Sequence, residues 1–212
     1  MIKKNKIDLN TWKRKAHFEF YKNYEQAFFN ITANVDVTNL YQFCKKNNYS
    51  FFLTCLYIST KTANSIEEFK TRLENDDAFI YDTINSGSTI LKEDNTFFFC
   101  YLEFFPDLEM FLANSRKQIN IQKKISFNDG NRDNQAVIYH STLPWISFTS
   151  VQHAQDKEKG NSVPKIVFGK YFNSGEQLLM PLSVEVHHAF ADGYHVGLFF
   201  DKFQKEIDHL SL

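Results

Sequence analysis

The chain has 212 residues, of which 43% are apolar and 23% charged, and its formal net charge is −1. This length and composition favour one globular domain, residues 1–212. Basic residues are not gathered in one block, which argues against nucleic acid as a partner, and no apolar run approaches the ~20 residues of a membrane span. The polar start lacks the apolar segment of a signal peptide, so we expect a cytoplasmic protein with no membrane partner.

The first predicted elements are two helices and a set of strands. The stretch DVTNLYQFCKKNN (36–48) places its apolar residues on one face and predicts a short helix. Ser50 is a suitable N-cap for a second helix, whose apolar side chains crowd nearly all round and predict a buried element. Residues 78–84, 88–94 and 96–104 are short apolar or alternating runs between turns, which predicts antiparallel strands.

The second half continues with another helix, more strands and a last helix. Residues 106–124 begin with proline and two acids and end in lysines, a polarity typical of a helix. Strands are predicted at 136–142, 145–152, 165–175 and 177–188, with a hairpin turn at 173–176. An amphipathic helix is predicted at 194–210. Without a regular βαβ rhythm, this order favours an α/β two-layer sandwich, with one mixed, mostly antiparallel sheet covered by helices.

Three cysteines, Cys44, Cys55 and Cys100, lie in apolar surroundings. Their odd number and their context favour buried free thiols over a disulfide or a zinc site.

The stretch EVHHAFADGYH (185–195) concentrates His187, His188, Asp192 and His195 between a predicted strand and the last helix. One interpretation is a metal site made by His188, Asp192 and His195, but no established ligand spacing supports it and no metal is predicted. A second is that these histidines only satisfy backbone groups. The third, which we favour, is that one of them is a general base, since neutral imidazole accepts a proton near neutral pH.

The spacing His-His-x-x-x-Asp-Gly resembles the signature shared by chloramphenicol acetyltransferases, dihydrolipoyl acyltransferases and peptide-synthetase condensation domains. The stretch VHHAFADGYHVG resembles the chloramphenicol acetyltransferases most, and TWKRKAHFEFY (11–21) and STLPWISFTS (141–150) resemble two further segments of that family. The resemblance implies a CoA-dependent acyltransferase fold and acetyl-CoA as a co-substrate, with no permanently bound cofactor. It also implies a homotrimer with active sites at subunit interfaces.

The resemblance assigns roles to individual residues. His188 matches the catalytic base, and His187 matches a non-catalytic histidine that satisfies backbone groups. Ser141 matches a serine whose hydroxyl stabilises the oxyanion of the tetrahedral intermediate. Asp192 matches an aspartate that supports the site by pairing with an arginine, here Arg14. The alternative for that pair is a surface ion pair of little energetic value.

The same resemblance places Lys170 and Tyr171 on the path of CoA. It gives the acceptor pocket a larger set of side chains: Phe20, Tyr21, Glu25, Phe29, Phe97, Val151 and His153. It implies that the base comes from one subunit and most of this pocket from its neighbour.

Several positions depart from the family pattern. Glu185 replaces a glutamine and could raise the basicity of the histidines or face away, and Val167 replaces a threonine linked to a water near the intermediate. Glu25, Val151 and His153 depart within the pocket. The expected function is acetyl-CoA-dependent O-acetylation of chloramphenicol, which confers antibiotic resistance. The alternatives are a same-fold acetyltransferase for another hydroxyl compound and a non-catalytic protein that binds hydrophobic ligands.

Overall fold

The computed structural model describes residues 2–124, 135–154 and 161–211. Within these residues, seven strands form a mixed sheet in the order β2-β10-β8-β7-β5-β6, with β9 paired to β10 off this path. The strands are β2 (Phe28–Asp36), β5 (Asn85–Leu91), β6 (Phe97–Leu102), β7 (Val137–Leu143), β8 (Lys165–Gly169), β9 (Phe172–Ser174) and β10 (Gln177–His187). The pairs β5·β7 and β7·β8 are parallel and the others antiparallel, which confirms the predicted fold class.

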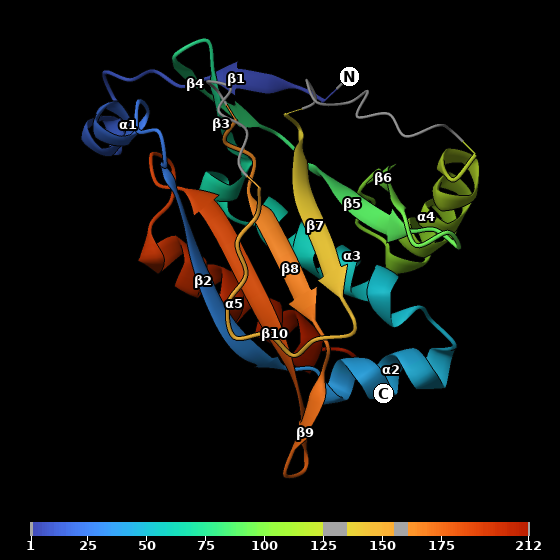
Figure 1. The fold of residues 1–212 in the computed structure, drawn as a ribbon. Coiled ribbons are helices and arrows are strands. Elements are labelled where there is room, and N and C mark those ends of the chain that lie inside the picture. The colour runs from blue at the N-terminus through green and yellow to red at the C-terminus, as the bar shows by residue number, and fades with distance from the viewer. Residues whose placement is uncertain (1, 125–134, 155–160, 212) are drawn as a thin grey trace.

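A small antiparallel sheet lies at the upper end of the molecule in Figure 1. It contains β1 (Lys4–Lys6), β4 (Asp77–Tyr81) and β3 (Thr71–Glu74) in that order. The sequence predicts one sheet, so this second sheet is a correction. Its edge strands are short or polar, and the three residues of β1 are all exposed, so hydrophobic periodicity gives no signal for them.

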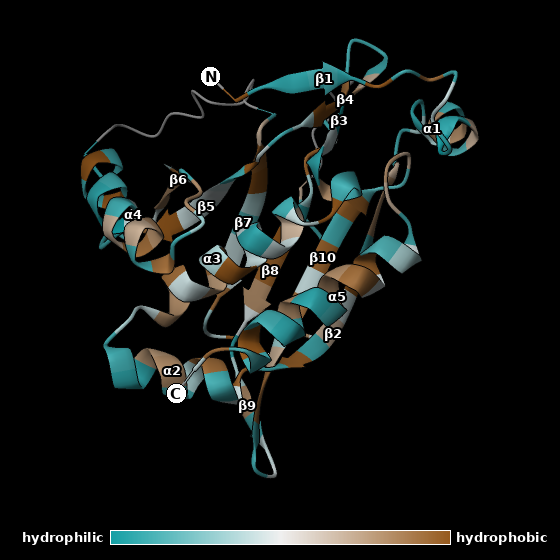
Figure 2. Cartoon of the chain, turned by 180° about the vertical axis from the view of Figure 1, so that it is seen from behind, coloured by the Kyte–Doolittle hydropathy of each residue, from teal (hydrophilic) through white to brown (hydrophobic). Residues whose placement is uncertain are grey.

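The helices lie mainly behind the large sheet in Figure 1 and in front of it in Figure 2. They are α1 (Lys15–Tyr21), α2 (Thr38–Asn47), α3 (Phe51–Asn64), α4 (Leu108–Gln122) and α5 (Gly193–Asp208), with a short 3₁₀ helix, η1 (Glu67–Lys70), after α3. Three predicted helices are confirmed by their caps: Asn48 ends α2 in the left-handed region, the Ser50 hydroxyl accepts from Leu53 N–H, and Asp107 accepts from Met110 N–H.

The main core lies between the sheet and the helices. Helix α5 buries Val196, Phe199, Phe203 and Ile207 against it, which confirms the predicted amphipathic helix. On β10 the side chains alternate, so Val184 and Val186 join this core while their neighbours point to the opposite face. We call that opposite face, which carries Ser141, Lys165, Val167 and Glu185, the far face.

The chain after β7 does not form the predicted strand at 145–152. Strand β7 already pairs with β5 on one side and β8 on the other, so no sheet edge beside it is free. The segment crosses the far face instead, where Phe148 lies against Gly169 and Ile146 O accepts from Lys170 N–H at 2.9 Å. The alternating pattern of these residues therefore reflects packing of a loop against the sheet, and not a strand within the sheet.

Cys44, Cys55 and Cys100 are buried and free, as predicted. Among the helices that the structure describes, none is long and apolar enough to cross a membrane.

Candidate active site

The histidine-rich stretch forms a tight turn between the end of β10 and the start of α5. Strand β10 ends at His187, and α5 begins at Gly193. The His188 N–H donates to the Ala27 carbonyl at 2.8 Å, which ties the turn to the chain entering β2. The turn is thus held by a buried strand, a helix and a neighbouring segment, and a side chain on it has a defined position.

The ring of His188 is oriented by one hydrogen bond and two aromatic contacts. Its Nδ1 lies 3.1 Å from the Ala191 carbonyl oxygen. A carbonyl can only accept, so Nδ1 carries the proton and Nε2 of the neutral ring has a free lone pair. Tyr21 stacks on the ring with centroids 4.2 Å apart and planes 7° apart, and Phe29 contacts it at 4.7 Å. This arrangement makes His188 Nε2 a fixed proton acceptor.

His187 has the opposite arrangement. The Ala189 N–H donates to its Nδ1 at 3.2 Å, so its proton is on Nε2. Burial, together with the nearby charges of His188 and Lys165, lowers the pKa of His187 to about 4. The ring is therefore neutral near pH 7, and its one unprotonated nitrogen already accepts a backbone hydrogen bond.

Asp192 joins the turn to the N-terminal helix. As the N-cap of α5, its Oδ1 accepts from the Tyr194 N–H at 3.0 Å, while Arg14 Nη1 donates to Oδ2 at 2.8 Å. Burial by itself would raise the pKa of Asp192, but the Arg14 hydrogen bond and the charge of His195 lower it to about 2. The side chains of Arg14 and Asp192 are 13% and 33% exposed, so this ion pair is partly buried.

His195 lies beside Asp192 on the first turn of α5, but the two do not form a metal centre with His188. In the described part of the chain no group of three or more His, Cys, Asp and Glu side chains could hold a metal ion. His195 contacts Asp192 through Nδ1 at 2.8 Å and Glu68 through Nε2 at 3.3 Å.

Ser141 lies on the far face, well away from His188 of the same chain. It is level with Val167 on β8, which is level with Ser183 on β10. His188 is five residues beyond Ser183, and β7 is two strands from β10. At ~3.3 Å per residue and ~4.8 Å between strands, Ser141 and His188 are roughly 19 Å apart. One chain alone does not bring the predicted base and oxyanion donor together.

The predicted acceptor residues fall into separate groups. Tyr21 and Phe29 contact His188 of their own chain. The expectation that the acceptor residues beside the base come from the neighbouring subunit is therefore wrong for these two. Phe20 is 60% exposed and packs on Tyr21, and Glu25 is exposed. Phe97 begins β6, four strands from β10.

Val151 and His153 follow β7 on the segment that crosses the far face, and both are half-buried. Burial lowers the pKa of His153, the charge of Glu185 raises it and that of Lys165 lowers it. Lys165 Nζ lies 2.6 Å from Glu185 Oε1, and these side chains are 9% and 4% exposed. The pKa of His187 is lowered by burial and by the charges of His188 and Lys165, which is opposite in direction to the higher basicity that Glu185 could have caused.

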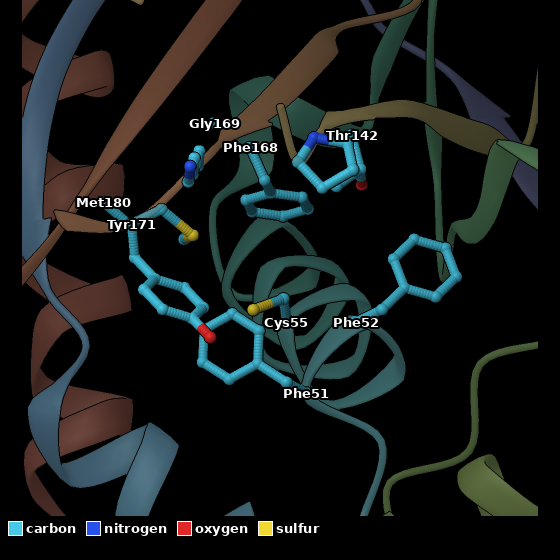
Figure 3. Close-up of a pocket in the computed structure, with 10 residues that line it drawn as sticks. Phe51, Phe52, Cys55, Thr142, Phe168, Gly169, Tyr171 and Met180 are labelled. Carbon is cyan, nitrogen blue, oxygen red and sulfur yellow. The ribbon is translucent and has the colours of Figure 1, made fainter. Parts of the chain in front are cut away.

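A cavity of about 350 Å³ opens between the end of β8 and the start of α3, and it includes both predicted CoA residues. Figure 3 shows Tyr171 next to Phe51 at its edge, with Cys55 and Met180 contributing sulfur atoms. The Tyr171 ring lies 5.5 Å from Phe51 and 5.6 Å from Tyr41. Sequence reasoning assigned Phe51, Phe52 and Cys55 only to a buried helix, because nothing in the pattern indicates which end of that helix borders a cavity.

Comparisons with known proteins agree with this architecture. The family model described as chloramphenicol acetyltransferase matches residues 2–204. A chloramphenicol acetyltransferase of Proteus mirabilis is 31% identical over 203 residues, 95% of this chain and 94% of that protein. One of Clostridium perfringens is 31% identical over 207 residues, 96% of this chain and 94% of that protein.

Solved structures give the same result. A chloramphenicol acetyltransferase has a TM-score of 0.87 at 31% identity, covering 97% of this chain and all of its own. The dihydrolipoamide acetyltransferase of Azotobacter vinelandii has a TM-score of 0.68 at 14% identity over 92% of this chain and 86% of its own, which shows a shared fold alone. With a family model spanning nearly the whole sequence and full-length relatives of this similarity, the chain belongs to the chloramphenicol acetyltransferase family.

Proposed function

We propose that this protein is an acetyl-CoA-dependent O-acetyltransferase that acetylates chloramphenicol and thereby confers resistance to it, with His188 as its general base. The observation that carries the proposal is the Nδ1 contact to the Ala191 carbonyl. It leaves Nε2 as the acceptor, in a chain whose family is named for this reaction.

In this mechanism His188 Nε2 takes the proton of an acceptor hydroxyl. The acceptor oxygen attacks the carbonyl carbon of the acetyl thioester and forms a tetrahedral intermediate with a negatively charged oxygen. The Ser141 hydroxyl donates a hydrogen bond to that oxygen, and losing such a donor typically costs roughly 10²–10³ in rate. The intermediate collapses by breaking the carbon–sulfur bond, and the His188 imidazolium returns its proton to the CoA sulfur.

The cavity lined by Lys170 and Tyr171 is the proposed binding region for part of acetyl-CoA. Its walls are largely aromatic and aliphatic, which suits the flat adenine ring or the pantetheine arm. Lys170 is exposed at its edge and supplies a positive charge for the CoA phosphates.

The separation of Ser141 from His188 supports a site built by two subunits. An acetyl carbonyl attacked by a hydroxyl in contact with His188 Nε2 cannot place its oxyanion within hydrogen-bond reach of a serine roughly 19 Å away. We therefore infer a homotrimer in which His188 and Tyr21 of one subunit face Ser141 of the next. Closed rotational symmetry repeats this junction three times.

A second acceptor class is favoured by one observation. The ion pair of Lys165 and Glu185 lies on the same face as Val167, two residues along β8 from it, and His153 lies within the influence of both charges. We take this face as one wall of the acceptor pocket, where it presents a charged pair to the acceptor. A hydroxyl compound with its own polar or charged group fits this wall better and is the alternative substrate.

Thiol release from acetyl-CoA tests both readings. The proposal predicts chloramphenicol-dependent release of free CoA and a mono-acetylated product of matching mass. Release with a polar alcohol but not with chloramphenicol would support the second class. No release with any hydroxyl acceptor, in a protein that still binds chloramphenicol, would leave a binding protein and overturn the enzyme proposal.

A further inference from the structure

The peptide group that joins Ala191 to Asp192 is held on both of its sides by histidines. Its carbonyl oxygen lies 3.1 Å from His188 Nδ1. Its N–H, which belongs to Asp192, lies 3.2 Å from His195 Nδ1. A peptide group is planar, so its C=O and N–H rotate together. Any rotation that weakens the bond to His195 therefore also moves the carbonyl that orients His188.

His195 is itself held in place by two carboxylates. Its Nε2 lies 3.3 Å from Glu68 Oε1 on η1, its Nδ1 lies 2.8 Å from Asp192 Oδ1, and its side chain is only 12% exposed. The shorter contact of Nδ1 is the one to the Asp192 carboxylate, which can only accept, while Nε2 makes an ion-pair contact with Glu68. A proton on Nδ1 is donated to Asp192 Oδ1 and a lone pair on Nδ1 accepts from the Asp192 N–H, so in either tautomer the ring holds Asp192.

We propose that His195 is a positioning residue for the acetyl-transfer reaction. His195 holds Asp192 through Nδ1, this fixes the Ala191–Asp192 peptide group, and that peptide group fixes the tautomer of His188, while Glu68 orients the His195 ring from its Nε2 side. This inference rests on the proposed function only in taking His188 as the base. It extends the site to η1, which belongs to the segment between α3 and the small sheet.

Two substitutions of the same residue separate positioning from bulk. In His195→Leu no atom accepts the peptide N–H, whereas in His195→Gln the side-chain oxygen accepts it, as glutamine does at this position of a capping box. A misplacement of about 1 Å at a reacting group costs up to roughly 100-fold in rate. We expect His195→Leu to lose roughly 10- to 100-fold in kcat, with an unchanged KM for acetyl-CoA. His195→Gln should keep most of the rate.

The matched controls are a second histidine at the end of α5 and the carboxylate that contacts His195. His209→Leu, at the exposed C-terminal end of α5, should leave kcat unchanged. Glu68→Leu should show a smaller loss of the same kind, and Glu68→Gln, which keeps an acceptor oxygen, should restore the rate.

Nuclear magnetic resonance of the full-length protein with ¹⁵N-labelled histidine gives a readout independent of activity. In the unsubstituted protein His188 should carry its proton on Nδ1, and His195→Leu should shift it toward the Nε2 tautomer. An unchanged His188 tautomer together with an unchanged kcat in folded His195→Leu would overturn the proposal. If His195→Leu does not fold, the Glu68 pair decides in the same way. If the unsubstituted protein transfers no acetyl group, the proposed function fails, but the tautomer shift still decides this inference.

Discussion

The two adjacent histidines at the end of β10 differ because their Nδ1 atoms meet different backbone groups. His187 Nδ1 meets an N–H and must accept, whereas His188 Nδ1 meets a carbonyl and must donate. The imidazole of His187 therefore has a structural role, whereas that of His188 has an unprotonated Nε2 that can act as a base. Sequence spacing and resemblance point to the second histidine, but only the partner atoms give the physical reason.

Replacing His188 with Ala should remove the base and lower kcat by roughly 10²–10⁴-fold, the usual contribution of general-base catalysis. Acetyl-CoA binding, measured by calorimetry, should remain, because the predicted CoA residues lie on other elements. The control is His187→Asn, whose side-chain oxygen can replace Nδ1 as the acceptor of the Ala189 N–H. Our assignment fails if the Asn variant is inactive while the Ala variant keeps more than a few per cent of the rate.

Buried histidines should also make stability depend on pH. His140 is hydrogen-bonded to Ser59 and Ser86, and burial lowers its pKa to about 3, against the opposing effect of the Gly87 backbone. The pKa of His187 is about 4. In the unfolded chain the pKa of each histidine is near ~6.5. Between its folded-state pKa and ~6.5, each histidine therefore binds more protons in the unfolded state. The contribution of the two neutral rings to the free energy of unfolding is therefore complete above pH ~6.5 and is lost as pH falls toward 4.

We therefore expect the free energy of unfolding in urea, at constant protein concentration, to decrease by an amount on the order of 1 kcal/mol per histidine and pH unit below 6.5. His187→Asn removes one of the two groups and should give a shallower decrease. The carboxylate of Asp192, with a pKa of about 2, contributes only at lower pH. Equal stability at pH 7.5 and pH 5 would contradict these buried, neutral rings.

At the scale of elements, the sequence predicts the long ones and misses the short ones. Helices α3 and α5 and strand β10 bury a continuous face or stripe, and that pattern is visible without a structure. Helix α1 has seven residues and one fully buried side chain, Phe18, and was not predicted. Segment 145–152 alternates like a strand but packs across the sheet, because β7 before it already has a neighbouring strand on each side. Local pattern cannot distinguish these cases because pairing is a tertiary property.

The ion pair of Arg14 and Asp192 is the link between α1 and α5, and it gives an element-scale prediction. Arg14→Ala leaves Asp192 with only the contacts of its own helix turn. The pair is neither fully buried nor on the surface, so the loss should be about 1–3 kcal/mol, between the values of those two classes. For a chain of this size Tm should fall by about 2–4 °C for each kcal/mol. Activity should fall with it.

Lys15→Ala is the control for Arg14→Ala, because Lys15 follows it at the start of α1 and, among the residues that the structure describes, makes an ion pair only with Glu19, at 3.9 Å and with both side chains exposed. It should change neither Tm nor rate. A variant at Arg14 that melts like the unsubstituted protein but has lost its activity would assign Arg14 to the chemistry and not to the support of the turn.

At the scale of the whole molecule, the candidate site could be predicted only in part. Resemblance in a short signature identified His188 and Asp192, and the structure places Arg14 on Asp192. It did not indicate that Tyr21 and Phe29 contact His188 within one chain, because these residues are 167 and 159 positions from His188 and the sequence gives no sign of their proximity. Nor did it indicate the Lys165–Glu185 pair, whose partners meet only through strand register. The acceptor is therefore the least predictable part of the site.

The central claim is that each active site combines His188 of one subunit with Ser141 of the next. Co-refolding of two inactive variants tests it most directly. His188→Ala lacks the base, and Ser141→Leu fills the facing site with a bulky side chain, so each homotrimer alone should be nearly inactive. In every mixed trimer one junction joins an intact His188 to an intact Ser141.

With equal amounts and random assembly three-quarters of the trimers are mixed, so about a quarter of all sites should be active. An acidic tag on one variant allows the mixed trimers to be separated by ion exchange and assayed alone, where about a third of the sites should be active. Mixing His188→Ala with the double variant His188→Ala/Ser141→Leu is the control and should recover nothing. Mixed trimers that form but remain inactive would contradict the shared site, as would a monomer that turns over at the full rate.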